Sequence, residues 1–142
     1  MSQGAKLVHG SPELPEEFKT SNGNFFEPVV LEDIPAGSRA FSEELFGPVF
    51  SLYKIRNDDE AVALANATEY GLGASLFCSD LDRAERVARR IDAGSVFIND
   101  FCKSQNDIPS GGTKGSGYGK ENYKEGFTDL SNAKSIVFAE QK

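Results

Sequence analysis

The 142-residue chain is poor in the residues on which several common chemistries depend. It has one histidine, two cysteines and no tryptophan, and its fifteen basic residues stand against twenty-two acidic ones. Two cysteines are too few for a disulfide framework, and a single histidine leaves too few ligands for a zinc site, so we expect no metal centre. The net charge of -7 repels nucleic acid and provides no basic stripe for phosphates, which disfavours nucleic-acid binding.

Long hydrophobic runs are also missing. The longest, such as Val49 to Tyr53, fall far short of the length that spans a membrane, and no charged-then-apolar leader opens the sequence. We therefore expect no membrane contact and a location in the cytoplasm or, alternatively, in the mitochondrial matrix. The length and the 39% hydrophobic content favour one core rather than two.

The only histidine is a weak candidate for nucleophilic catalysis. A Ser-His-Asp or Cys-His mechanism would depend on His9 alone, in the context LVHGS. Nothing near it in the sequence pairs with it, so a surface histidine at the end of a strand is the favoured interpretation.

What the chain does contain is a regular alternation of strand and helix patterns. Strands are expected at Lys6 to His9, Phe25 to Leu31, Val49 to Ile55, Gly71 to Phe77, Ser95 to Ile98 and Ser135 to Ala139. Helical segments are expected at Ala40 to Phe46, after Asn57, from Ser79 to Ile91, and at Asn122 to Leu130. This order predicts an α/β fold with a mainly parallel sheet and crossover helices that cover both faces.

Local signals mark the ends of the two longer helices. Asn57 with Glu60, and Ser79 with Asp82, stand at the spacing of a capping box, in which side chains satisfy the free amides of a helix start. Gly94 is expected to end the second helix in the left-handed conformation.

The glycine-rich stretch GGTKGSGYGK, residues 111–120, has the wrong register for a phosphate-binding loop. Lys120 stands where the dinucleotide fingerprint needs its third glycine, and Glu121 follows it in place of Ser or Thr. We favour the alternative that these glycines let the backbone pass close to another segment.

The stretch SEELFGPVF, residues 42–50, places two adjacent acids and an aromatic before a Gly-Pro helix stop. In the simplest interpretation, the acids favour a helix start, Phe46 fills the core, and Gly47 with Pro48 ends the helix. A carboxylate can also accept hydrogen bonds from both hydroxyls of a ribose, and a phenyl ring can flank a planar ring. The residues alone leave both interpretations open.

A series of motifs resembles the C-terminal end of the aldehyde dehydrogenase superfamily over nearly the whole chain. They follow in the order GAKLVHG, GNFFEPVVLEDI, EELFGPVF, EAVALANATEYGLGASLF, DLDRAERVARRIDAGSVFIN and GGTKGSGYGKE. The stretch GSVFINDFCKSQNDI is most similar to the succinate-semialdehyde dehydrogenase-like branch. The resemblance implies oxidation of an aldehyde to an acid with NAD or NADP, through a cysteine thiohemiacetal, hydride transfer and hydrolysis of the thioester.

The resemblance also assigns roles to residues. Glu44 is expected to hydrogen-bond the nicotinamide ribose, and Phe46 to pack beside the nicotinamide. Asn99 matches a position that supports the active-site side of the sheet, with Gly111 and Gly112 as further structural support. The loop from Asp100 to Ser110 resembles the lining of the aldehyde tunnel, and its candidate substrate contacts are Phe101, Cys102, Lys103 and Ser110.

Several positions depart from the family pattern. Pro109 and Ser110 stand before the glycine pair where the family usually has an aromatic, which would make the tunnel more polar. Lys103 either pairs with a substrate carboxylate or is simply solvated. Cys78 and Cys102 do not match the nucleophile's motif, and we interpret both as unreactive thiols.

No residue of this chain is expected to be catalytic. The family carries its nucleophilic Cys, oxyanion Asn and general-base Glu upstream of the segment that this chain resembles. We therefore expect no turnover from the chain alone, and weak or absent binding of NAD or NADP, because most of the cofactor contacts are missing.

The resemblance divides the chain into two regions and implies both small-molecule and protein partners. Residues 1–132 correspond to the C-terminal part of the catalytic domain, and residues 133–142, which include AKSIVFAE, to an oligomerisation-type strand. The expected partners are a small aldehyde and the nicotinamide cofactor in the full-length enzyme, with a homo-oligomer or pairing with the missing enzyme segment. The alternative is a non-catalytic interaction or oligomerisation module, because unpaired strand edges favour association.

Overall fold

The computed structural model describes residues 2–20 and 22–140. Contacts between residues divide the chain into two compact units, Met1–Ala61 and Val62–Lys142, and each is described by itself. Among the described residues, every helix falls short of the apolar length that a bilayer crossing requires.

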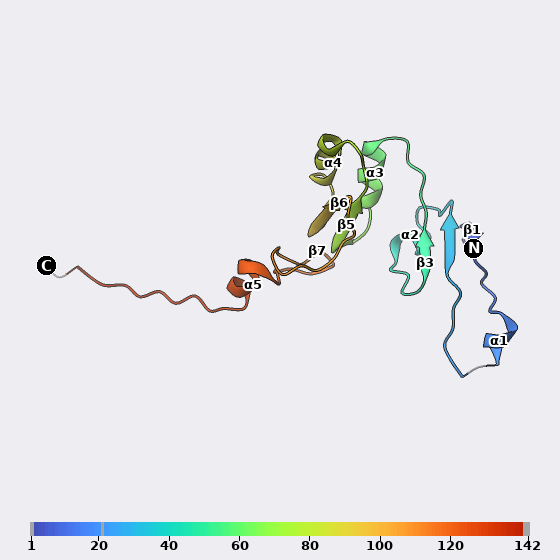
Figure 1. The fold of residues 1–142 in the computed structure, drawn as a ribbon, viewed down its shortest axis with the longest axis horizontal. Helices are drawn as coiled ribbons and strands as arrows, with labels where there is room; N and C mark the ends of the chain where they lie inside the picture. The colour runs from blue at the N-terminus through green and yellow to red at the C-terminus, as the bar shows by residue number, and fades with distance from the viewer. Residues whose placement is uncertain (1, 21, 141–142) are drawn as a thin grey trace. The chain divides into compact units, whose positions relative to one another are not determined.

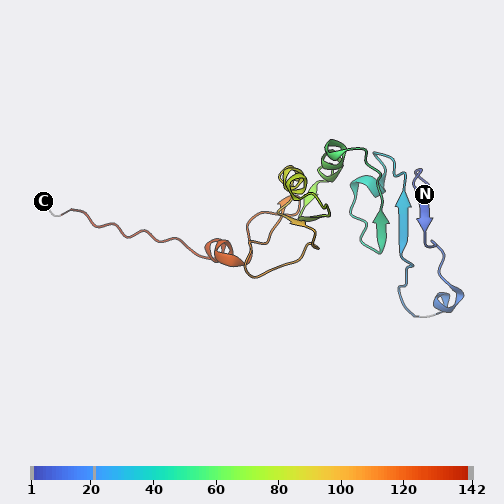
Figure 2. The same cartoon turned by 45° about the horizontal axis from the view of Figure 1, so that its top comes forward.

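The first unit is built on a three-stranded sheet in the order β1-β2-β3 (Figures 1 and 2). The strands are β1 Lys6–His9, β2 Val29–Glu32 and β3 Val49–Ser51, and the connections carry two short helices, α1 Glu16–Lys19 and α2 Arg39–Ser42. β1 runs antiparallel to β2, whereas β2 runs parallel to β3 with Val29 opposite Val49. Ala5, Val29 and Ile34 form the small buried core of this unit.

The second unit contains a strand-helix-strand crossover. β5 Gly73–Leu76 lies parallel to β6 Ser95–Ile98, and α4 Leu81–Ala88 connects them and contacts β6 (Figure 1). The buried side chains of α4 are Ala84 and Val87, which recur at a three-residue step on one face of the helix. The other elements are α3 Asp58–Ala65, which begins in the first unit, the antiparallel pair β4 Tyr70–Gly71 and β7 Thr113–Lys114, and α5 Tyr123–Asp129.

The α/β class is confirmed, but the expected mainly parallel sheet is not, because the described strands form three small sheets, one mixed, one antiparallel and one parallel. The two parallel pairs are β2 with β3 and β5 with β6. Within each pair, the connection from the first strand to the second carries a helix, α2 in one and α4 in the other. The antiparallel pairs are β1 with β2, whose connection carries α1, and β4 with β7, between which the chain forms the whole crossover; period and spacing did not reveal either pairing.

The expected strand Ser135 to Ala139 was wrong for this structure, because residues 132–140 take no regular secondary structure. A strand needs a neighbour to accept its backbone hydrogen bonds, and none of the described residues pairs with this segment.

The helix caps were predicted with mixed success. Asn57 accepts the backbone N–H of Glu60 through Oδ1 at 2.9 Å, as expected, while the Glu60 carboxylate reaches the backbone N–H of Arg56 at 2.8 Å. The cap predicted at Ser79 was wrong by one residue, because the Asp80 carboxylate accepts the backbone N–H of Arg83 at 2.9 Å.

Gly94 does not adopt the left-handed conformation that we expected. It is required for a different reason, since a Cβ at this position would lie 1.6 Å from the carbonyl oxygen of Gly111. The backbone after α4 and the backbone of the glycine-rich stretch therefore pass in direct contact, which agrees with the interpretation of that stretch as a close approach.

Replacing Gly94 with Ala should destabilise the chain, because one of the two backbones must move. We expect Gly94→Ala to lower the free energy of unfolding by about 2 to 4 kcal/mol, measured by urea denaturation. Gly47→Ala is the matched control, since a Cβ there meets no atom within 4 Å, and it should change stability by less than about 1 kcal/mol. Equal losses in the two variants would contradict the close approach.

Candidate functional site

Asn99 joins the end of β6 to the segment that follows β5. Its side-chain Oδ1 accepts the backbone N–H of Cys78 at 2.8 Å, and its Nδ2 donates to the Cys78 carbonyl at 2.9 Å. Its backbone has a φ of 55°, in the left-handed region that Asn tolerates better than most residues. The amide thus makes both hydrogen bonds that a neighbouring strand would make, and it directs the chain into the loop that follows.

The loop after Asn99 folds back onto β5. The ring of Phe101 lies edge-on to Phe77 at 5.7 Å between centroids, although 74% of Phe101 is exposed. The backbone N–H of Cys102 donates to the hydroxyl of Ser75 at 2.8 Å. The Cys102 sulfur lies directly over Gly73, where a Cβ would come within 2.2 Å of it.

Lys103 already has a carboxylate partner in this loop. Its Nζ lies 2.7 Å from Oδ2 of Asp100. This hydrogen bond, together with the backbone N–H of Phe101, holds the pKa of Asp100 below its usual value. Binding of a second carboxylate by Lys103 would therefore compete with Asp100.

Ser110, Gly111 and Gly112 lie together at a cavity of about 380 Å³ in the second unit. Ser110 pairs with Glu121 through two backbone hydrogen bonds, which close the base of the glycine-rich stretch. The Lys120 ammonium donates to the carbonyls of Gly111 and Gly112 at 3.3 and 3.4 Å. The residues at the start of the tunnel loop, Phe101, Cys102 and Lys103, are not among those that line this cavity.

The two adjacent acids of SEELFGPVF have different surroundings in the connection between α2 and β3. Glu43 forms an ion pair with Arg39 at 2.8 Å, which lowers the pKa of Glu43. Glu44 is exposed and makes no hydrogen bond or ion pair with any described residue, and Phe46 is 96% exposed, so the simpler of the two interpretations, in which Phe46 fills a core, does not hold in this structure. Of the two acids, only Glu44 is without a partner among the described residues. Because Glu44 belongs to the first unit and Asn99 to the second, their roles at a common site stay predictions.

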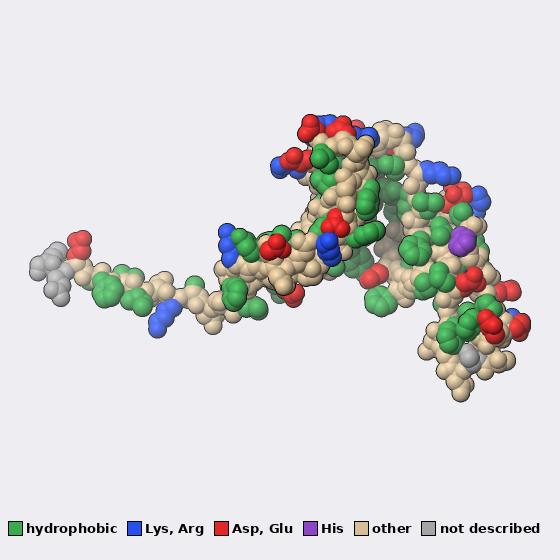
Figure 3. Space-filling model, viewed as in Figure 1, with side chains coloured by type: hydrophobic (Ala, Val, Ile, Leu, Met, Phe, Trp, Pro, Cys, Tyr) green, Lys and Arg blue, Asp and Glu red, His purple; other side chains and the backbone are tan. Residues whose placement is uncertain are grey.

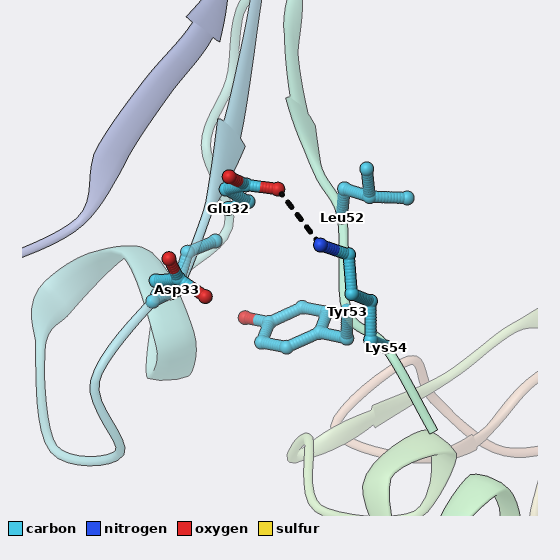
Figure 4. A pocket seen from close by; sticks show the side chains of 6 residues that line it. Glu32, Asp33, Leu52, Tyr53 and Lys54 are labelled. Carbon is cyan, nitrogen blue, oxygen red and sulfur yellow. Dashed lines mark ion pairs between the residues drawn. The ribbon is translucent and has the colours of Figure 1, made fainter. Parts of the chain in front are cut away.

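A separate, smaller cavity of about 170 Å³ lies in the first unit (Figure 4). Two acidic residues, Glu32 and Asp33, line it, and Glu32 is bound by Lys6 at 2.6 Å and lies 3.6 Å from Lys54. The hydrogen bond from Lys6 is the main cause that lowers the pKa of Glu32, and the charge of Lys54 adds to it. The charge of this carboxylate is compensated within the chain, so we interpret the cavity as a structural feature. Within residues 2–20 and 22–140, no three acidic, histidine or cysteine side chains gather as metal ligands would.

A polar cluster beside the glycine-rich stretch was not anticipated from the sequence. Lys114, Asn66 and Asp92 meet there, although they lie far apart in the chain. The only signal was their position, since Asn66 and Asp92 each follow the expected end of a helix. Neither spacing nor periodicity relates those positions to Lys114.

The strand-helix-strand crossover and the glycine-rich return define an α/β protein. The comparison with protein families is more specific, because the model of the aldehyde dehydrogenase family matches residues 1–136. The chain belongs to the aldehyde dehydrogenase family.

Related proteins agree with this assignment. The chain is 48% identical over 96% of its length to succinate-semialdehyde dehydrogenase [NADP(+)] of Deinococcus radiodurans. It matches the solved structure of succinic semialdehyde dehydrogenase from Streptococcus pyogenes in complex with NADP+, with a TM-score of 0.87 and 34% identity over 98% of the chain. It also matches betaine aldehyde dehydrogenase from Staphylococcus aureus in complex with NAD+, with a TM-score of 0.78 and 38% identity over 88% of the chain.

The chain spans only part of these relatives. It covers 28% of the Deinococcus radiodurans protein, and 30% and 25% of the two solved chains.

The Asp100–Lys103 pair gives a pH-dependent prediction. Lys103→Met should raise the pKa of Asp100 toward its ordinary value of 3.8, followed as the NMR titration of the side-chain carboxyl carbon. Because the folded pKa is lowered, the pair stabilises the folded chain above the ordinary carboxyl pKa and loses this contribution as pH falls through the folded pKa. Lys124→Met, which removes an exposed lysine elsewhere, should leave the Asp100 midpoint in place. An unmoved midpoint in Lys103→Met would show that the pair does not form in solution.

Proposed function

We propose that this chain is the C-terminal part of an NAD(P)-dependent aldehyde dehydrogenase that oxidises a carboxylate-bearing aldehyde such as succinate semialdehyde. The observation that carries the proposal is the 48% identity, over 96% of the chain, to a succinate-semialdehyde dehydrogenase. The match to a solved enzyme of this substrate class in complex with NADP+ supports it.

The cofactor contacts proposed for this chain are Glu44 and Phe46. A carboxylate that is free of internal partners can accept hydrogen bonds from both ribose hydroxyls, and Glu44 meets this condition while Glu43 does not. Phe46 follows Glu44 by two residues, and its exposed ring offers an apolar face against which the planar nicotinamide could pack. When bound, the nicotinamide accepts the hydride that leaves the substrate, and Glu44 and Phe46 would hold it in one orientation.

On the substrate side, we propose that Ser110 makes the tunnel wall polar. Its hydroxyl stands where the family usually has an aromatic, and the backbone bridge to Glu121 fixes its position. An aldehyde that carries a carboxylate is accommodated better by a polar wall than by an apolar wall, because burial of a charge without polar partners is costly. Lys103 is a second candidate for that carboxylate, in competition with Asp100.

A second candidate function, association through the C-terminal segment, has its own observation. Residues 132–140 are extended and exposed, and Ile136, Val137 and Phe138 expose 72%, 88% and 89% of their surface. Figure 3 shows hydrophobic side chains standing free along this segment. Exposed apolar side chains on a backbone with unpaired polar groups favour pairing with another strand. We propose that the segment pairs with a second copy of the chain or with the remainder of the enzyme.

The function is tested in a hybrid enzyme, in which this chain replaces the matching segment of the Deinococcus radiodurans relative. We expect the hybrid to oxidise succinate semialdehyde with formation of reduced cofactor, followed by absorbance, and the chain alone to give no turnover. An inactive but folded hybrid would overturn the proposed function, and robust turnover by the chain alone would overturn the assignment of catalysis to other residues.

The adjacent acids provide a matched pair of variants in the same hybrid. Glu44→Gln should raise the KM for the cofactor about tenfold or more, because hydrogen bonds to a charged acceptor are among the stronger ones. Glu43→Gln should change it less than about threefold, since Glu43 faces Arg39. Equal effects of the two variants would argue against a ribose contact by Glu44.

The association proposal is tested by light scattering on the chain. We expect the wild type to show a mass above that of the monomer, and Phe138→Asp to shift it toward the monomer, because a buried charge would oppose strand pairing. Tyr118→Asp removes a fully exposed aromatic outside the segment and should leave the mass unchanged. A monomeric wild type would exclude self-association. Pairing with the remainder of the enzyme would then be tested by a pull-down of that remainder with this chain.

A further inference from the structure

Lys114 combines a strained backbone with a side chain that is held in place. Its φ is 51°, in the left-handed region that residues other than glycine seldom adopt. Only 24% of its side chain is exposed. Its Nζ donates to the carbonyl of Thr68 at 3.0 Å and to that of Asn66 at 3.4 Å, and lies 3.5 Å from the Asp92 carboxylate. Backbone strain of this kind persists only where the surroundings impose it.

The groups around Lys114 belong to the ends of two helices. Asn66 and Thr68 follow α3, and Asp92 follows α4. The Asn66 side chain joins the two ends, because its amide donates to the carbonyl of Arg90 at 2.9 Å and accepts the backbone N–H of Asp92 at 2.8 Å. The ammonium of Lys114 therefore binds a preformed group of oxygens, which we call the helix-end cluster: Asn66, Thr68 and Asp92.

A short chain of contacts leads from Lys114 to the glycine pair. The adjacent Thr113 donates through its hydroxyl to the carbonyl of Gly71 at 3.3 Å, and the Gly71 N–H donates to the hydroxyl of Ser116 at 3.0 Å. The same Gly71 carbonyl accepts the N–H of Gly94 at 3.0 Å, and Gly94 lies against Gly111. Because a Cβ at Gly71 or Gly94 would collide with its neighbours, the contacts leave little space, and we expect a shift at Lys114 to reach the glycine pair.

We propose that Lys114 is a positioning residue for the substrate cavity. By binding the helix-end cluster, its side chain sets the positions of Ser110, Gly111 and Gly112. The inference rests on the proposed function in that these three residues border the cavity that would receive the aldehyde. Lys114 does not itself line that cavity and acts through the backbone.

The first test uses the full chain and requires no activity. Hydrogen exchange of the backbone amides of Gly115 and Ser116, which bond to Glu69 and Thr113, should accelerate about tenfold or more in Lys114→Met. The amides between β5 and β6 should change less than about threefold, and Lys114→Arg should restore slow exchange. Lys114→Gly should also exchange fast, because it relieves the backbone strain but loses the ammonium. Unchanged exchange, or uniform acceleration over the whole second unit, would overturn the inference.

The second test measures kinetics in the hybrid enzyme. Lys114→Met should raise the KM for succinate semialdehyde about tenfold while kcat and the KM for the cofactor stay within about threefold, and Lys114→Arg should recover most of the loss. Lys124→Met is the control for loss of a lysine, since its side chain is 75% exposed on α5.

If the unsubstituted hybrid is inactive, the proposed function fails while hydrogen exchange still decides the role of Lys114. If the hybrid is active and Lys114→Met matches it, only the inference about Lys114 fails.

Discussion

The contact between the backbones at Gly94 and Gly111 is the constraint on which the second unit depends. A side chain at Gly94 has no space, because the Gly111 carbonyl oxygen occupies the place of its Cβ. This contact brings the turn after α4 against the stretch that follows the loop 100–110, across a separation of seventeen positions in the sequence. The crossover, the glycine pair and the cavity beside Ser110 are thereby fixed to one another, so packing and site geometry have the same origin.

Several acids of the chain are paired with basic side chains, and Glu44 is not. Glu32, Glu43, Glu60 and Asp100 each face a basic side chain of this chain, and the pKa of each lies below its usual value. Glu44 has no such partner among the described residues. The carboxylate of Glu44 therefore keeps all its acceptor positions open to solvent, which is the condition that the proposed ribose contact requires.

The sequence predicts elements better than it predicts their connections. The strand Ser95–Ile98 and the existence of the helix α4 were foreseen because hydrophobic period is a local signal, although the cap of that helix lies one residue later than expected. The antiparallel return of β1 onto β2, and the helix-end cluster around Lys114, depend on contacts between distant residues that no local pattern encodes. At the site, Glu44 and Ser110 were named through resemblance, whereas the close approach at Gly94 was assigned to the wrong glycine property. Both a turn and a contact require glycine, and composition alone does not distinguish them.

The Asn99 amide has a consequence for which substitutions the position tolerates. It presents one acceptor and one donor to the same residue, Cys78, and therefore substitutes for a peptide group. Aspartate has the same shape but offers two oxygens, one of which would face the Cys78 carbonyl and repel it, and leucine would offer neither group. Exchange of this one amide for a carboxylate would thus weaken the junction between β6 and the loop 100–110 with almost no change in side-chain volume.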